Sequence, residues 1–473
     1  MNVREIEPLV WEVADAREDM RVPARAFADA ELIEAIRGDD SLVQLQNVAT
    51  LPRVARSALA MPDIHSGYGF PVGAVAAMEL PDGVVSPGGV GYDINCGVRL
   101  LALPLHAREL GRRKERLVHE ISRRVPTGAG RDGGLPLRAG ELERVLRDGA
   151  GALAARGIGT EKDVEHTESG GRLDGADPQR VSERARTRGS GQLGTLGSGN
   201  HFIEVQRVEG IFEAEAAAAY GLEEGLVTVL IHSGSRGLGH QVCTDFVKRM
   251  DAALPRHGIV LPDRQLSCAP ASSAEGEAYL AAMAAAANFA WANRQAIAYG
   301  IREAVCDVLG AQVADATRQV YDVAHNVVKR ERHGHADVLV HRKGATRAFP
   351  PGHPEIPAAH RDVGQAVFIP GSMGTSSFVL AGRPGSMERS FGTVCHGAGR
   401  RLSRTGARKQ IEGAALRRQL EDAGITVRCP SNKGLAEEAP FAYKDVEKVV
   451  EVVERAGLAA RVARLRPLGV VKG

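Results

Sequence analysis

Six short runs of β-branched and apolar residues, separated by very unequal lengths of chain, constrain the fold of this sequence more than any other feature. They occupy residues 72–80, 97–103, 201–208, 226–233, 337–342 and 366–370, and each is bounded by glycine, proline, aspartate or asparagine. Such runs are typical of β-strands. Because the helical stretches are grouped rather than placed one after each strand, the pattern favours mixed or antiparallel sheets over a regular barrel or a doubly wound sheet.

Apolar spacing and charged faces predict helices over residues 28–60, 107–123 and 274–309, and the last of these is alanine-rich. A length of 473 residues allows two or three domains or one large enzyme fold. With 44% hydrophobic and 25% charged residues, the composition is that of a globular protein, not of a disordered or coiled-coil chain. We expect an α/β fold of mixed α+β type. Residues 1–473 should form a single compact body, in which packed mixed sheets surround a catalytic cleft and helices surround the sheets.

Residues 127–200 are rich in glycine and charge, which is typical either of a linker between domains or of mobile loops around a site. The segments that carry candidate functional residues lie on both sides of this stretch. Since the two halves must meet to build one site, we expect mobile loops within a single domain.

The sequence predicts a cytoplasmic protein without a membrane partner. Charged residues interrupt the first fifteen positions, where a secretory signal needs an apolar run. The longest apolar run, Ala278 to Ala287, is shorter than the roughly 18 residues of a membrane-spanning helix. The six cysteines are far apart, so each is interpreted as a core thiol, a ligand or a nucleophile rather than half of a disulfide.

Five histidines stand at the ends of apolar runs, directly before or after glycine, asparagine or serine: His65, His201, His232, His325 and His396. One histidine in such a setting is more often a hydrogen-bonded structural residue than a functional one. Five in the same setting favour delivery of their side chains from strand or helix ends into a common cleft.

Asp93 and Cys96 lie three residues apart in a glycine-rich turn that leads into a predicted strand. Glycines let the backbone approach an ion or a phosphate closely. A carboxylate and a thiolate, together with His201, His232 and His325, make five candidate metal ligands. For Cys96 alone a buried thiol is the simpler interpretation, and ligand softness favours zinc over manganese, so these residues leave the metal's identity open.

Three glycine- and serine-rich segments, 197–202, 370–377 and 396–404, are of a kind that presents backbone N–H groups to an anion. None has the Gly-Lys-Ser/Thr ending of a P-loop, and each alone is compatible with an ordinary tight turn. His396 opens the last segment, so its imidazole is a candidate nucleophile toward a phosphorus atom held there. Arg400, Arg404 and Lys409 follow at near-helical spacing, either as a path for a polyanion or as a solvated face.

Eight ordered motifs resemble the RtcB family of RNA-splicing ligases, from about residue 60 to the last residue. They are MPDIHSGYGFPVG, GGVGYDINCGVR, GSGNHFIEV, IHSGSRGLGHQVCTDF, VAHNVV, PGSMGTSSFVL, CHGAGRRLSR and PLGVVKG. The resemblance implies a ligase dependent on GTP and manganese that joins RNA ending in a 2′,3′-cyclic phosphate or 3′-phosphate to RNA with a 5′-hydroxyl, in tRNA splicing or RNA repair. It also implies a nucleophile, His396, which becomes guanylylated.

The resemblance assigns site residues motif by motif. Asp93, Cys96 and His201 are implied as ligands of one manganese ion, and Cys96, His232 and His325 as ligands of the second, so that Cys96 bridges the two. The implied guanylate pocket consists of Asn200, His201, Phe202, Ile203, Glu204, His325, Asn326, Pro370, Gly371, Ser372, Met373, Ser377, His396, Gly397, Ala398, Gly399 and Lys472. The residues expected to contact RNA are His65, Arg400, Arg404 and Lys409.

Two other classes of function remain open on the sequence. A metal-dependent phosphodiesterase or phosphatase needs the same ligands but no covalent nucleotide. A non-enzymatic RNA-binding protein does not need five candidate ligands, and 4% aromatic residues offer it few stacking platforms. We expect RNA, either tRNA halves or broken ends, as the partner, with an archease-type activator as a further candidate and a monomer as the working form.

Overall fold

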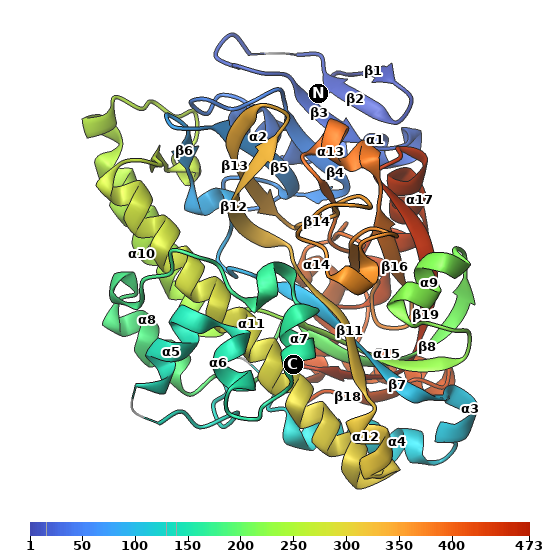
Figure 1. The fold of residues 1–473 in the computed structure, drawn as a ribbon. Helices are drawn as coiled ribbons and strands as arrows, with labels where there is room; N and C mark the ends of the chain where they lie inside the picture. Colours follow the sequence, from blue (N-terminus) through green and yellow to red (C-terminus); the bar gives the residue numbers. More distant parts are fainter. Residues whose placement is uncertain (16, 129, 139) are drawn as a thin grey trace.

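A seven-stranded sheet forms one half of the protein in the computed structural model, which describes residues 1–15, 17–128, 130–138 and 140–473 (Figure 1). Its strands, in spatial order, are β1 (Val3–Glu7), β2 (Val10–Val13), β3 (Ala24–Phe27), β4 (Ala58–His65), β5 (Val72–Glu79), β13 (Ala336–Lys343) and β12 (Asn326–His333). Strands β3 and β4 pair in parallel, whereas the other neighbours in this sheet are antiparallel. The sheet is therefore mixed, as predicted.

An eight-stranded sheet forms the other half. In spatial order its strands are β11 (Arg318–Ala324), β7 (Gly97–His106), β9 (Leu226–Ser233), β8 (Phe202–Ile211), β19 (Ala459–Lys472), β16 (Ser377–Gly382) and β15 (Ala366–Ile369), with β18 (Thr426–Arg428) beside β19. Two small sheets pair β6 (Val84–Val85) with β10 (Ala269–Pro270) and β14 (Ala345–Arg347) with β17 (Thr393–Cys395). One residue, His325, separates β11 from β12, so the two large sheets meet there.

Helices surround the sheets (Figure 1). They are α1 (Ala30–Ile36), α2 (Ser41–Val48), α3 (Ala107–Leu110), α4 (Arg113–Arg124), α5 (Glu141–Asp148), α6 (Ala150–Ala154), α7 (Glu161–Glu165), α8 (Glu183–Ser190), α9 (Ala214–Tyr220), α10 (Arg236–Ala253), α11 (Ala274–Leu309), α12 (Ala311–Asp315), α13 (Pro384–Ser390), α14 (Arg404–Arg408), α15 (Gly413–Asp422), α16 (Asn432–Glu437) and α17 (Val446–Arg455). None of the helices that the structure describes has the length and apolarity that a bilayer crossing requires.

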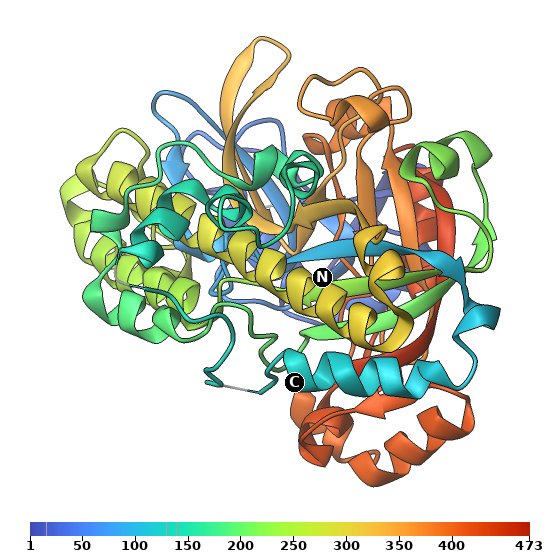
Figure 2. The same cartoon turned by 60° about the horizontal axis from the view of Figure 1, so that its bottom comes forward.

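The 36-residue helix α11 runs diagonally through the molecule and packs against α4, α10, α5 and α6 (Figures 1 and 2). Most of its middle is buried on all faces, because its short alanine side chains let neighbouring elements approach closely. Ser273 caps its N-terminus by accepting a hydrogen bond from the N–H of Gly276. Figure 2 shows α4 running beside α11.

The predicted fold class is confirmed, and all six predicted strands are present as β5, β7, β8, β9, β13 and β15. The prediction of helix over residues 28–60 was wrong beyond residue 48, because β4 begins at Ala58. Every position of β4 before its last is buried, so its sequence shows no alternation of apolar and polar residues that would mark a strand. The predicted helix over 107–123 is divided into α3 and α4 by Gly111, whose φ is +47°.

The segment 127–200 was predicted to be loops, and that was wrong where α5, α6, α7 and α8 form. Each of these helices is only five to eight residues long. Helices this short are not stable on local propensity and depend on tertiary contacts, which α8 makes with α10, α5 and α6 make with α11, and α7 makes with α6 and β11. The mobility of the segment, and the single domain that it implied, stay predictions.

Candidate active site

Four neighbouring strands of the eight-stranded sheet end at the same edge and bring four side chains together there. In the register of the sheet, Gly97 pairs with both Ala324 and Ser233, and His232 pairs with Phe202. Cys96, His201 and His325 each stand one residue outside such a paired position, and His232 is itself paired. Antiparallel pairing therefore converts sequence separations of more than a hundred residues into direct contact.

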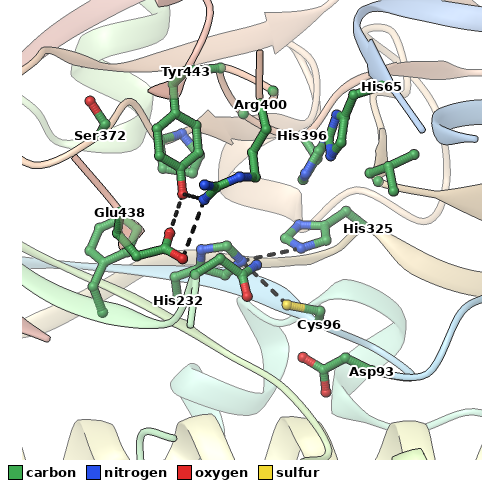
Figure 3. Close-up of a pocket in the computed structure, with 18 of the residues that line it drawn as sticks. His65, Asp93, Cys96, His232, His325, Ser372, His396, Arg400, Glu438 and Tyr443 are labelled. Carbon is green, nitrogen blue, oxygen red and sulfur yellow. Dashed lines mark hydrogen bonds and ion pairs between the residues drawn. The ribbon is translucent and has the colours of Figure 1, made fainter. Parts of the chain in front are cut away.

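The converging atoms form two triads that share one sulfur. Cys96 Sγ lies 3.4 Å from His201 Nε2 and 3.3 Å from His232 Nε2. His232 Nε2 lies 3.3 Å from His325 Nε2 (Figure 3). His201 Nε2 lies 2.8 Å from Asp93 Oδ2. In each of the two groups, Asp93–Cys96–His201 and Cys96–His232–His325, the candidate ligand atoms lie within 4.8 Å of one another.

Burial sets the protonation of these groups. It lowers the pKa of His232 and of His325 well below the usual value, so both imidazoles are neutral and offer a lone pair. Burial and the neighbouring Asp93 raise the pKa of the Cys96 thiol. Burial also tends to raise the pKa of Asp93, but His201 and Arg236 outweigh it and hold that pKa below its usual range. A cation shared by the triads would convert the thiol to a thiolate, because a coordinating thiol loses its proton.

A buried arginine of α11 fixes the backbone beside two of the candidate ligands. Arg294 donates from Nη1 to the carbonyl of Asn95 at 2.8 Å and to that of Ser233 at 2.9 Å, the residues next to Cys96 and His232. Its charge is compensated by Asp322 at 2.7 Å, and neither side chain is exposed. Asn95 has a φ of +52°, a left-handed conformation that asparagine tolerates better than most residues. The hydrogen bonds of Arg294 thus tie the turn that positions Cys96 to α11.

His396 follows β17 and faces the triads. Its backbone N–H donates to Asp63 Oδ2 at 3.0 Å, and its Nδ1 lies 2.6 Å from the same oxygen. The Asp63 side chain is fully buried, and although burial tends to raise the pKa of this carboxyl, His396 outweighs it and lowers that pKa. The ring centroids of His396 and His325 are 4.9 Å apart, so the candidate nucleophile adjoins the second triad.

A cavity of about 270 Å³ joins His396 to the triads. Thirteen of the residues predicted for the guanylate pocket line it: Asn200, Phe202, His325, Asn326, Pro370, Gly371, Ser372, Met373, His396, Gly397, Ala398, Gly399 and Lys472. The cavity is bounded at one end by Asp93 and Cys96 and at the other by Glu438 and Tyr443 (Figure 3). Segments that lie far apart in the chain, from His65 to Lys472, thus share one wall.

Four residues predicted for the pocket do not line the cavity. Ile203 belongs to the core on the other face of its sheet, because successive side chains of a strand point to opposite faces. Glu204 and Ser377 both contact the amide of Gln206, and Ser377 Oγ accepts from the N–H of the lining residue Gly371 at 3.2 Å. Burial raises the pKa of Glu204 to about 8. The fourth is His201, which the structure places in the first triad.

Glu438, at the end of the cavity away from Asp93, forms ion pairs with three positively charged side chains. Arg400 and Arg404 each lie 3.3 Å from Glu438 Oε1, and Lys472 Nζ lies 3.8 Å from Oε2. The hydroxyl of Tyr443 also donates to Glu438. Three of the residues predicted to contact RNA, His65, Arg400 and Arg404, line the cavity, whereas Lys409 is exposed on the surface outside it.

Sequence reasoning missed Asp63, Glu438 and Tyr443. Asp63 stands two residues before His65 in a segment that the motif analysis singled out, so a signal was present but pointed to the histidine. Glu438 and Tyr443 lie in a charged stretch without a motif, and their contacts with Arg400 join segments 38 and 43 residues apart. No local pattern marks such a partner.

The chain is similar to a family of known RNA-splicing ligases. A family model described as tRNA-splicing ligase RtcB matches residues 44–473. The chain is 52% identical over 476 residues to the tRNA-splicing ligase RtcB of Thermococcus kodakarensis, covering 100% of this chain and 99% of that protein. It is 50% identical to that of Archaeoglobus fulgidus, again over 100% of this chain and 99% of the relative. The RNA-splicing ligase RtcB of Mycobacterium tuberculosis is 51% identical over 91% of this chain and 100% of its own length.

Proposed function

The chain belongs to the RtcB family of tRNA-splicing ligases, and from this membership we propose a GTP- and manganese-dependent RNA ligase. It joins RNA that ends in a 3′-phosphate or a 2′,3′-cyclic phosphate to RNA that begins with a 5′-hydroxyl, in tRNA splicing or RNA repair. One observation carries the proposal: a histidine held by a buried carboxylate, His396 with Asp63, shares a cavity with two triads of candidate metal ligands.

Asp63 prepares His396 as a nucleophile. A carboxylate only accepts, so the 2.6 Å contact requires Nδ1 of His396 to carry the proton and leaves the lone pair on Nε2. Nε2 attacks the α-phosphorus of GTP; a nitrogen–phosphorus bond forms, the bond to the bridging oxygen of the β-phosphate breaks, and pyrophosphate leaves. Asp63 stabilises the positive charge that develops on the imidazole.

Two further displacements complete the joining. An oxygen of the RNA 3′-phosphate attacks the phosphorus on His396, the nitrogen–phosphorus bond breaks, and GMP passes to the RNA end. The 5′-hydroxyl oxygen of the second strand then attacks the 3′-phosphorus, its proton is lost to solvent, and GMP leaves. A cyclic phosphate is first opened by hydrolysis, which yields the 3′-phosphate that the first displacement needs.

The two triads fit a pair of divalent transition metals. The Nε2 atoms of His201 and His232 lie 3.4 and 3.3 Å from the Cys96 sulfur, and the candidate ligand atoms of each triad lie within 4.8 Å of one another in a largely buried place. Such crowding of lone pairs is unfavourable unless a cation shares them. We assign Asp93, Cys96 and His201 to one ion and Cys96, His232 and His325 to the other; manganese itself is assigned from family membership. Bound ions of this kind would neutralise the triphosphate and polarise the attacked phosphorus.

The rest of the cavity is assigned to the guanylate. The segments 370–373 and 396–399 line it with backbone suited to phosphate oxygens. At the wall away from Asp93, Phe202 contributes an aromatic ring and Lys472 an ammonium group. The Lys472 nitrogen lies 5.4 Å from the centroid of the Phe202 ring. RNA contacts are proposed for His65, Arg400, Arg404 and Lys409, because the three cations follow His396 closely in the sequence and because His65, Arg400 and Arg404 line the cavity.

Covalent labelling tests the proposal. The protein is incubated with manganese chloride and GTP labelled at the α-phosphate, and retained label is measured after denaturation; GTP labelled at the γ-phosphate is the negative control. We expect a label that is stable in alkali, lost in acid, absent from His396→Ala and normal in His335→Ala, a variant of an exposed histidine in the β12–β13 turn. No label on the wild-type protein, with release of phosphate from RNA ends, would instead support the phosphodiesterase or phosphatase.

A further inference from the structure

Three aromatic side chains stack at the edge of the cavity near Asp93. The rings of Tyr68 and Tyr92 are edge to face with centroids 5.2 Å apart, and those of Tyr92 and His240 are stacked at 4.8 Å with an interplanar angle of 28°. Tyr68 lies after β4, Tyr92 in the turn before Cys96, and His240 on α10. Tyr92 lines the cavity, whereas His240 is exposed to solvent. We call Tyr68, Tyr92 and His240 the aromatic ladder.

The aromatic ladder is not part of the core. The chain has seven tyrosines, and three of them, Tyr220, Tyr279 and Tyr321, are almost completely buried. Tyr68 and Tyr92 remain partly exposed and belong to none of the hydrophobic core clusters of the described residues. Rings that stack on one another and still present faces to solvent offer a surface on which another flat group can stack.

Positive charge lies beside the aromatic ladder. Arg236 stands at the first position of α10, four residues before His240, and its Nη1 lies 3.2 Å from His201 Nδ1. Arg188 is exposed, and after burial its charge is the largest influence that lowers the pKa of His240. A ligand that stacks on these rings therefore has cations within reach of its anionic part.

We infer that Tyr68, Tyr92 and His240 form a stacking platform for the terminal bases of the RNA strand that ends in a 3′-phosphate. The inference rests on the proposed ligase function and adds to it the place where that strand lies. Aromatic rings stack on any base, so such a platform binds an RNA end without selecting its sequence. This suits a ligase that must accept different broken ends.

Positive charge near the aromatic ladder favours the RNA strand that ends in a 3′-phosphate over the strand that begins with a 5′-hydroxyl. A terminal 3′-phosphate is an anion, and two cations lie on this side of the protein: Arg236 contacts His201 of the first triad, and Arg188 donates to Gln241, the residue after His240. A strand that begins with a 5′-hydroxyl brings no terminal charge to that place. The opposite end of the cavity, with Phe202, Lys472 and Glu438, is already assigned to the guanylate, so the platform serves a different base.

Fluorescence anisotropy with a labelled single-stranded RNA tests the platform, in manganese chloride and without GTP. Three probes are used: an RNA with a 3′-phosphate, the same RNA with its last two nucleotides abasic, and an RNA with a 5′-hydroxyl and a blocked 3′ end. The variants are His240→Ala, Tyr92→Leu and the double variant; Tyr299→Leu, which removes an exposed tyrosine of α11, is the control. Melting temperature and manganese content exclude loss of fold or metal.

We expect the double variant to bind the 3′-phosphate RNA about tenfold or more weakly than the wild type and to bind the abasic RNA as the wild type does. Tyr299→Leu should match the wild type on every probe. Wild-type affinity of the double variant for the 3′-phosphate RNA, or an equal loss on the abasic probe, would overturn the platform. A loss confined to the 5′-hydroxyl probe would overturn the choice of strand. Absence of GMP labelling in the wild type would count against the ligase itself, not the ladder.

Discussion

Replacing Asp63 by asparagine removes one charge from behind His396 and little else. The amide oxygen still accepts from the backbone N–H of His396 and from its Nδ1, which lie 3.0 and 2.6 Å from Oδ2 in the native protein. The amide nitrogen takes the place of Oδ1, which is buried and has no hydrogen-bond partner among the residues that the structure describes. We therefore expect His396 to keep its place while the stabilisation of its developing positive charge falls.

The size of the effect follows from the kind of bond. A hydrogen bond to a charged group contributes about 1.5 to 3 kcal/mol when the pair is shielded from solvent. Here the Asp63 side chain is fully buried and that of His396 is 14% exposed, so the full range applies. At about 1.4 kcal/mol for each factor of ten, Asp63→Asn should slow guanylylation about 10- to 150-fold.

Single-turnover quench-flow with labelled GTP and excess enzyme measures that rate directly. Asp82→Asn, which changes a carboxylate 64% exposed and far from the cavity wall, is the matched control and should keep the native rate. Manganese content should be unchanged, because Asp63 belongs to neither triad. A rate within twofold of the native one refutes the reasoning. A parallel fall in bound metal would show that Asp63 acts on the triads instead.

Three other changes have expected outcomes. Cys96→Ala should remove both bound ions, since both triads share its sulfur, and one retained equivalent by metal analysis would contradict the sharing. Lys472→Ala should slow guanylylation at least about tenfold while the melting temperature changes little; if both fall together, the pair with Glu438 is structural. Burial lowers the pKa of His341 to about 4. As the pH falls from 6.5 to 4, His341 is protonated in the unfolded chain but not in the folded one, so the free energy of unfolding decreases. His341 contributes about 3 kcal/mol to that decrease, so in urea titrations the decrease should be smaller by about this amount in His341→Gln.

The sequence allowed the strands and their chemistry to be predicted together. His232 is the next-to-last residue of the apolar run that forms β9, and Cys96 directly precedes the run that forms β7, so the strand assignment also placed both residues at strand ends. That these strand ends share one edge of the sheet is a property of the register, which pairs Gly97 with Ser233 and which no local pattern reveals. The motifs therefore indicated which residues meet, whereas the distances came only with the sheet.

Buried partners that lie far away in sequence escaped prediction. Asp63 contacts His396 across 333 residues, and a buried aspartate in a strand looks like any other aspartate in the sequence. The same holds for β4, whose uniform burial hid its strand period, and for the helices between residues 141 and 190, which depend on tertiary contacts. Local secondary-structure propensity does not predict an element whose conformation is determined by tertiary contacts.

Helix α11 gives the site an order of assembly. A long alanine-rich helix forms from contacts between near neighbours, which is fast. The side chains of Asn293 and Arg294 donate hydrogen bonds to the carbonyls of Thr195, Ser233 and Asn95, which close chain separations of 98, 61 and 199 residues. Contacts between such distant residues form slowly. We therefore expect the ligand-bearing turns to converge only when the formed helix docks between them, so that the affinity for metal arises late in folding.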